Sequence, residues 1–257
     1  MAYLKAHHWD YIFYRAFANI RAESSKYYLS FLWWILQPIM LMAMYYLVFA
    51  VILERRTPDF VAFLLVGIST FMWTTQTITH CMSSIQQGKG LMNQIDMPKL
   101  VFPSVYIVMD IIKFAIVLLI LMIYLNLYGI HIGISYLALP LILLPHLFLT
   151  MFLGYLAAAI IPFLPDLTFV IQLVMRVLRY ISGVMFPLSF VPENIRPYFY
   201  LNPLAVLIEQ YRNVLIHGQW PSWMDLGLVG LFTFIGLVLV IALIRRLDHI
   251  YPRVCSL

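Results

Sequence analysis

Six long apolar stretches recur along the chain, and they restrict its fold more than any other feature. About 20 apolar residues in a helix cross the hydrocarbon core of a bilayer, and a helix satisfies its own backbone polar groups there. The sequence therefore predicts an all-α integral membrane protein with six transmembrane helices. These spans are expected over residues 29–53, 60–80, 101–127, 134–161, 167–185 and 226–244.

The composition agrees with a membrane protein. Of the 257 residues, 63% are hydrophobic and only 11% are charged, whereas a soluble domain is roughly one-quarter charged. No polar stretch is long enough for a separate domain, so we expect a single transmembrane domain over residues 1–257. Its expected parts are an N-terminal cytoplasmic interface helix (1–28), spans one to five (29–185), an external re-entrant segment (186–224), span six (225–247) and a cytoplasmic tail (248–257).

The segment before the first span has its own helical pattern. Apolar residues recur at helical spacing over residues 5–21, and basic residues are scattered among the polar positions. This pattern predicts a basic amphipathic helix lying in the headgroup plane. A helix packed on a partner protein is the alternative, and both can hold together. The apolar positions are Trp9, Ile12, Phe13, Ala16, Phe17 and Ile20.

The distribution of basic residues predicts the orientation. Nine Lys and Arg residues lie on the side of the two termini: four before the first span, two in the 81–99 loop and three in the tail. The opposite side carries four. Cytoplasmic loops carry the excess, so both termini are expected in the cytoplasm of a bacterial inner membrane. This topology also accounts for the net charge of +5, so nucleic acid is not an expected partner.

The second predicted span is unusually polar, with hydroxyl and amide side chains along much of its length. Such a helix is expected to face other protein or water rather than lipid. Its polar residues are Ser69, Thr70, Thr74, Thr75, Gln76, Thr77 and Thr79. Cys81 follows it, and Cys255 lies in the tail; both are expected to be inert cytoplasmic thiols.

Charged residues inside predicted spans are the most informative polar residues, because each is costly unless paired or hydrated. Asp110 and Lys113 lie three residues apart and are expected to pair with each other on one helix face. Arg176 and Arg179 also share a face, with no acid close by in that span. Two interpretations stay open for them: a hydrated pathway for an anionic substrate, or pairing with Asp166 or with acids on other helices.

Aromatic residues crowd the first span. Phe31, Trp34 and Tyr45 are candidate channel residues, because aromatic faces stack on sugar rings and such contacts have little directionality. Core packing and a lipid-facing belt are the alternative.

The sequence lacks the motifs that are typical of catalytic and nucleotide-binding sites. The sequence Gly88-Lys89-Gly90 lacks the other residues of a phosphate-binding loop, so this chain is not expected to hydrolyse ATP. No catalytic, cofactor or metal site is expected in it.

Three blocks of sequence carry a resemblance to a known family. The first is Leu32–Pro38, which holds a Leu-Trp entry into the first span. The second is Leu91–Pro103, with two spaced prolines. The third is Met185–Gly218, with an Asn-Pro pair followed by Glu and Arg. The chain resembles the type-2 ABC export permeases, and within them the polysaccharide exporters for O-antigen, capsule and teichoic acid. It departs from them at Ser30, where the family usually has glycine, and at Met97, where it usually has phenylalanine.

The resemblance implies a homodimeric permease with two ATPase subunits, which bind the ATP and Mg²⁺. The implied substrate is an undecaprenyl-pyrophosphate-linked polysaccharide. Export of drugs or small lipids is the first alternative, and an ATP-independent secondary transporter or channel is the second. The implied ATPase-coupling residues are Gln87, Lys89, Leu91, Asp96, Met97, Pro98 and Lys99. The implied external cap holds Glu193, Arg196, Asn202, Pro203, Glu209 and Arg212, whose charged members are expected to pair.

Overall fold

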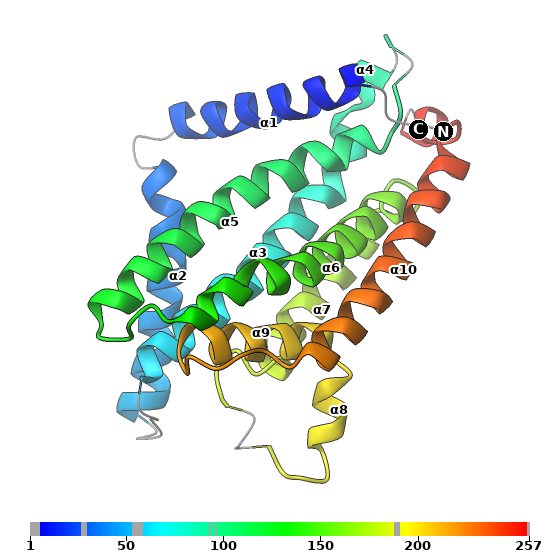
Figure 1. The fold of residues 1–257 in the computed structure, drawn as a ribbon. Coiled ribbons are helices and arrows are strands. Elements are labelled where there is room, and N and C mark those ends of the chain that lie inside the picture. The colour runs from blue at the N-terminus through cyan, green and yellow to red at the C-terminus, as the bar shows by residue number, and fades with distance from the viewer. Residues whose placement is uncertain are drawn as a thin grey trace.

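The computed structural model describes residues 6–26, 30–52, 59–92, 94–95, 97–187 and 191–255. Within these residues every regular element is helical, as predicted (Figure 1). The elements are α1 (Ala6–Lys26), α2 (Ser30–Tyr46), the π-helical η1 (Leu47–Ile52), α3 (Phe60–Gln87), α4 (Lys89–Met92), α5 (Val101–Leu127), the 3₁₀ turn η2 (Ile134–Ala138), α6 (Leu139–Ile160), α7 (Leu167–Ile181), α8 (Arg196–Tyr200), α9 (Pro203–Leu215), α10 (Trp223–Leu247) and α11 (Tyr251–Val254).

The two ends of the bundle differ. Helices α1, α4 and α11 lie at one end, which we call the terminus end, and α8 and α9 lie at the other, which we call the far end (Figure 1). Helices α2, α3, α5, α6, α7 and α10 run between these ends. The described chain therefore passes along the bundle six times and has α1 and α11 at the same end.

Five of these passes are long and apolar enough to cross a membrane: Leu32–Ile52, Phe60–Met92, Val101–Leu127, Ile134–Ile160 and Trp223–Leu247. The remaining pass, α7, has only 15 residues and is about 22 Å long. It ends earlier than the predicted span because Gly183 turns the chain with φ +65°, a value that glycine adopts without strain. Length alone therefore supports five of the six predicted spans.

Helix α3 is the centre of the bundle. It packs against α2, α5, α6, α7 and α9, and its hydroxyl residues Thr70, Thr74 and Thr77 are buried. The prediction that this polar helix faces protein is confirmed. The helix continues to Gln87, so Cys81 is buried within it and does not lie in a cytoplasmic loop as predicted.

The N-terminal helix α1 lies across the terminus end (Figure 1). Ile12 and Ala16 are fully buried, and their cluster includes Val101 and Val105 of α5. The predicted apolar stripe is thus divided between two faces. One face packs on the chain's own bundle, and the other leaves its aromatic side chains exposed, as an interface helix requires. The exposed residues are Trp9, Phe13 and Phe17.

Candidate functional site

A cleft opens between α2, α3 and α7, with a volume of about 550 Å³. The α3 residues that line it follow one another at spacings of three, one, three and one, so they share one helix face. The α2 residues follow one another at spacings of four, three, one and three, so they also share one face, and all except Gln37 are apolar. Lining residues are Trp33, Gln37, Met40, Leu41 and Met44 of α2, Met72, Thr75, Gln76, Thr79 and His80 of α3, and Arg179 of α7.

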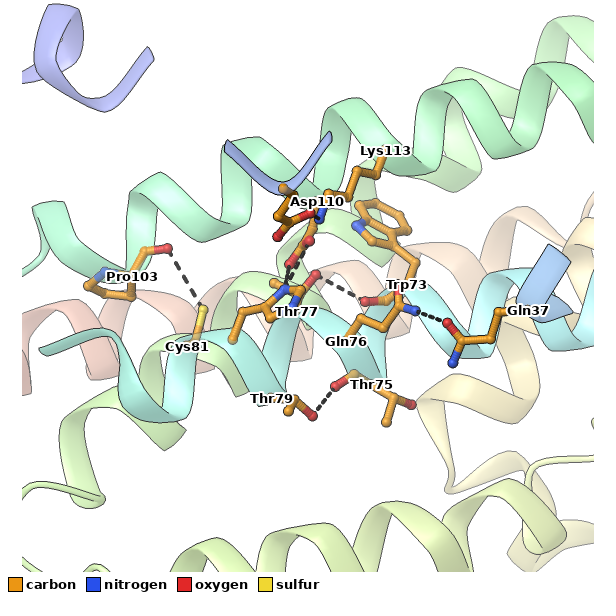
Figure 2. A network of polar contacts seen from close by, with 12 residues as sticks. Gln37, Trp73, Thr75, Gln76, Thr77, Thr79, Cys81, Pro103, Asp110 and Lys113 are labelled. Atoms are coloured by element: carbon orange, nitrogen blue, oxygen red, sulfur yellow. Dashed lines mark hydrogen bonds and ion pairs between the residues drawn. The ribbon is translucent and has the colours of Figure 1, made fainter. Parts of the chain in front are cut away.

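Polar groups line the α3 wall of this cleft. The Gln76 amide donates to Oε1 of Gln37 at 3.3 Å and links the two walls (Figure 2). Thr75 and Thr79 each donate their hydroxyl proton to a backbone carbonyl one turn earlier, at 2.9 and 2.8 Å. These bonds satisfy the hydroxyl donors inside a membrane while leaving their oxygen lone pairs as acceptors.

The two candidate arginines of α7 have different surroundings. Arg179 is half-buried, lines the cleft and has its guanidinium 5.6 Å from the Phe71 ring. Arg176 is exposed and does not line the cleft. Neither arginine forms an ion pair within the described part of the chain, so the alternative of pairing with Asp166 finds no support. The role of both residues in substrate passage stays a prediction.

The predicted Asp110–Lys113 pair is wrong, because each residue pairs with a different helix. Nδ1 of His80 lies 2.8 Å from Oδ2 of Asp110 and 3.1 Å from Oδ1. Nζ of Lys113 lies 2.6 Å from Oε2 of Glu23 in α1 and 4.9 Å from the centre of the Trp34 ring. Figure 2 shows both side chains leaving α5 at this point. The two charges thus tie α5 to α3 and to α1.

The predicted aromatic channel residues do not gather in the cleft. Trp34 lines a separate cavity of about 30 Å³ with Lys113, Tyr45 is buried in the core, and the Phe31 side chain lies outside the described residues. Trp33 lines the cleft instead. Spacing alone could not have selected Trp33, because Trp33 and Trp34 lie four and three residues before Gln37 and both positions share its helix face.

At the far end, the Asn-Pro pair begins α9. Oδ1 of Asn202 accepts a hydrogen bond from the Leu204 N–H at 3.1 Å, so it is the N-cap. Pro203 occupies the first helical position, where its missing N–H costs nothing. The Asn202 amide also donates to the Ser182 hydroxyl at 2.8 Å and connects α9 to the end of α7.

Arg212 of α9 is buried and binds three backbone carbonyls. It donates to Phe63 of α3 at 3.2 Å, to Gly183 at 2.7 Å and to Val184 at 2.9 Å. Its guanidinium also lies 3.4 Å from the centre of the Phe63 ring. We call this arrangement the Arg212 clamp. It joins α9, α3 and the turn after α7 at one point.

The charges of the predicted external cap do not pair with one another as expected. Within the described residues no ion pair joins Glu193, Arg196, Glu209 and Arg212. Arg196 instead donates to the Val191 carbonyl at 3.4 Å. Backbone carbonyls of Phe63, Gly183 and Val184 take the place of carboxylates around Arg212.

The predicted coupling segment lies at the terminus end, and its residues differ in exposure. Gln87 and Lys89 are exposed, Leu91 and Pro98 are half-buried, and Met97 is buried. Asp96 lies outside the described residues. Met97 packs in the cluster of α1 and α5, so this part of the segment is in contact with the interface helix.

Lys99 of this segment is buried and contacts the C-terminal tail. Its backbone N–H donates to Oδ1 of Asp248 at 2.8 Å, and its Nζ lies 3.6 Å from Oδ2. Further along the tail, the buried Tyr251 hydroxyl donates to the Ala159 carbonyl at 3.2 Å, and burial raises the pKa of this phenol. Burial also raises the pKa of the Cys255 thiol, which favours the unreactive protonated form.

A buried polar network that the sequence did not predict lies beneath the far end. Nε2 of His146 is 2.8 Å from the Thr74 hydroxyl, and its Nδ1 is 3.2 Å from the Tyr211 hydroxyl. The network joins α6, α3 and α9. Nothing in the spacing of these residues indicates it, because they come from three distant segments.

Comparison with known proteins identifies the family. The model of the ABC-2 type transporter family matches residues 11–216, and the chain belongs to that family.

Relatives cover most of the chain at low identity. An O-antigen export system permease protein RfbA of Klebsiella pneumoniae is 21% identical over 87% of this chain and 84% of its own. A protein of the same name from Myxococcus xanthus is 26% identical over 79% of each chain. The polysialic acid transport protein KpsM of Escherichia coli is 25% identical over 90% of this chain and 91% of its own. The relatives are thus named as transport permeases and polysaccharide transporters.

Proposed function

We propose that this chain is the transmembrane subunit of an ATP-driven exporter that moves undecaprenyl-pyrophosphate-linked polysaccharide of the O-antigen or capsule type across the bacterial inner membrane. Membership of the ABC-2 family supports the transporter class. Relatives named for O-antigen export and polysialic acid transport support the substrate class.

The observation that carries the proposal is the two-sided character of the cleft. Its α2 wall offers the Trp33 ring and methionine side chains, whereas its α3 and α7 walls offer hydroxyls, amides, an imidazole and the Arg179 guanidinium. A lipid-linked glycan has the same division, with a hydrocarbon tail, an anionic phosphate group and sugar hydroxyls. Aromatic faces and side-chain amides suit the sugars, and a cation suits the phosphate.

The faces that α2 and α7 leave uncovered support the proposal of a homodimer. Met175 is the one buried side chain of α7 within the described residues. Exposed apolar side chains on these helices include Met40, Met44, Phe169, Leu173 and Val177. A second copy placed against them would enlarge the cleft into a passage wide enough for a polymer. Such self-complementary contacts are typical of twofold assemblies.

Two ATPase subunits, which bind ATP and Mg²⁺, are proposed to contact the terminus end. The exposed Gln87 and Lys89 and the half-buried Leu91 and Pro98 would form the contact. The tie between Lys99 and Asp248 and the packing of Met97 beside α1 would pass the movement into the bundle. In this proposal both termini lie in the cytoplasm.

One observation favours a second candidate, export of drugs or small lipids. An apolar groove of about 690 Å³ lies between α5 and α6, lined by residues such as Phe114, Leu118 and Leu143. It has the character of a site for a hydrocarbon chain. The cleft nevertheless suits a glycan better, because a purely apolar substrate would not need the hydroxyls and amides of its α3 wall.

The proposal is tested by locating the lipid-linked glycan in cells that lack the gene. Loss of surface glycan, with polymer accumulating on undecaprenyl lipid in the cytoplasm, is the expected result, and a plasmid copy should restore export. Unchanged surface glycan would contradict the substrate assignment and favour drug or lipid export.

A further inference from the structure

His80 is the imidazole that lines the cleft, and Asp110 determines how its ring is held. The carboxylate oxygens lie 2.8 and 3.1 Å from Nδ1, so Nδ1 carries a proton and donates it. The side chain of Asp110 is 3% exposed and that of His80 is 32% exposed. A buried acid thus fixes a partly accessible ring, whose other nitrogen, Nε2, is left for a ligand in the cleft.

The position of His80 along α3 is that of an entry point. It lies seven residues before Gln87, the last residue of α3 at the terminus end, which is about 10 Å along the axis. Arg179 stands farther in, because it contacts Phe71, nine residues earlier on α3. Thr79, Gln76 and Thr75 line the cleft between His80 and Arg179.

We propose that His80, positioned by Asp110, binds the phosphate or pyrophosphate group of the lipid-linked substrate at the terminus-end mouth of the cleft, and that Arg179 receives this group deeper in the bilayer. When the ring carries both protons, Nε2–H is a charge-assisted donor to a phosphate oxygen, and the Asp110 carboxylate balances the ring charge. The hydroxyls and amides between the two sites replace water around the moving anion. This inference rests on the proposed function and names the part of the substrate that the cleft binds first.

The alternative is that the His80–Asp110 contact only joins α3 to α5. The two roles differ in what they control. A phosphate site controls the substrate concentration at which the transporter responds, whereas a packing contact controls the amount of folded protein and the maximal rate.

The test uses the permease with its ATPase in vesicles of zwitterionic lipid, with undecaprenyl pyrophosphate as the probe. The measured quantity is the probe concentration for half-maximal stimulation of ATP hydrolysis. His80→Gln should raise it by about tenfold, the effect of losing one charge-assisted hydrogen bond, with the maximal rate regained at saturation. His80→Lys, which keeps a cation beside Asp110, should stay within about threefold of wild type. His131→Gln changes an exposed histidine of the 128–133 turn outside the cleft and should change nothing.

Each remaining outcome has a defined meaning. An unchanged half-maximal concentration for His80→Gln, with a lower maximal rate or yield, would overturn the inference and leave the proposed function standing. No stimulation of the wild-type complex by undecaprenyl pyrophosphate or by lipid-linked glycan would instead overturn the proposed function. If the His80→Gln defect appeared only after phosphatidylglycerol was added to the vesicles, the phosphate would come from bulk phospholipid, and the assignment to the substrate carrier would be wrong.

Discussion

The guanidinium of Arg212 lies directly against the backbone of Gly67, where a Cβ would overlap Nη2 of Arg212. Residue 67 therefore has to be glycine for the Arg212 clamp to form. A helix interior usually disfavours glycine relative to alanine. At position 67 glycine therefore lowers the stability of the helix, but it allows the buried Arg212 guanidinium to approach the backbone.

Gly67→Ala is expected to destabilise the protein by about 2 kcal/mol, because displacement of the guanidinium removes hydrogen bonds from a charged donor to Phe63, Gly183 and Val184. The free energy of unfolding of the purified protein in detergent checks this. Gly227→Ala is the matched control, since a Cβ there meets no atom within 4 Å. A stability equal to that of the control would contradict the clamp.

Asn202→Ala should lower the free energy of unfolding by about 1 kcal/mol, the usual effect of losing an N-cap. Asn202→Asp keeps the acceptor for the Leu204 N–H and should retain most of this contribution. Ser182→Ala removes only the contact to α7, so comparing the three variants separates the cap from the tie between helices. Equal losses in the Asp and Ala variants would show that the cap contributes nothing.

The Glu23–Lys113 ion pair should hold the interface helix α1 on α5. The Glu23 side chain is 39% exposed, so solvent screens the pair and its coupling energy should be on the order of 1 kcal/mol. A double-mutant cycle with Glu23→Gln and Lys113→Gln measures it. The charge-reversed double variant, Glu23→Lys with Lys113→Glu, should recover part of the stability lost by each reversal alone. Strict additivity in the cycle would mean that the pair is not formed.

The contact between Lys99 and Asp248 should transmit movement between the coupling segment and the tail. Asp248→Ala is expected to lower substrate-stimulated ATP hydrolysis by about fivefold, which corresponds to a coupling free energy near 1 kcal/mol. Asp248→Asn keeps an acceptor for the Lys99 N–H and should be milder. His249→Ala, at the exposed neighbouring position, is the control. An effect of the same size at position 249 would point to general disturbance of the tail.

Much of the fold could be predicted from the sequence, because the length of an apolar stretch indicates whether a helix can cross the bilayer. The expected third span and α5 have the same bounds, 101–127, and the hydroxyl-rich second span is the buried central helix. Where prediction failed, a local turn was responsible. The positive φ of Gly183 ends the pass early, although the apolar run continues to Met185.

The candidate site was less predictable, because its contacts join residues far apart in the chain. His80 and Asp110 are 30 residues apart, and Lys113 and Glu23 are 90 apart. A spacing rule for one helix therefore selected the nearest partner and missed the true one. Arg212 binds backbone carbonyls, and every residue has one, so no side-chain pattern could have indicated its partners.

The shortness of α7 has a consequence for the membrane around it. A helix of about 22 Å cannot match a hydrocarbon layer of about 30 Å, and a bilayer beside a short hydrophobic element thins or admits headgroups and water. Arg179 stands on this helix. We therefore expect the bilayer to be thinnest beside the cleft, which would lower the dielectric barrier that an anionic headgroup has to cross there.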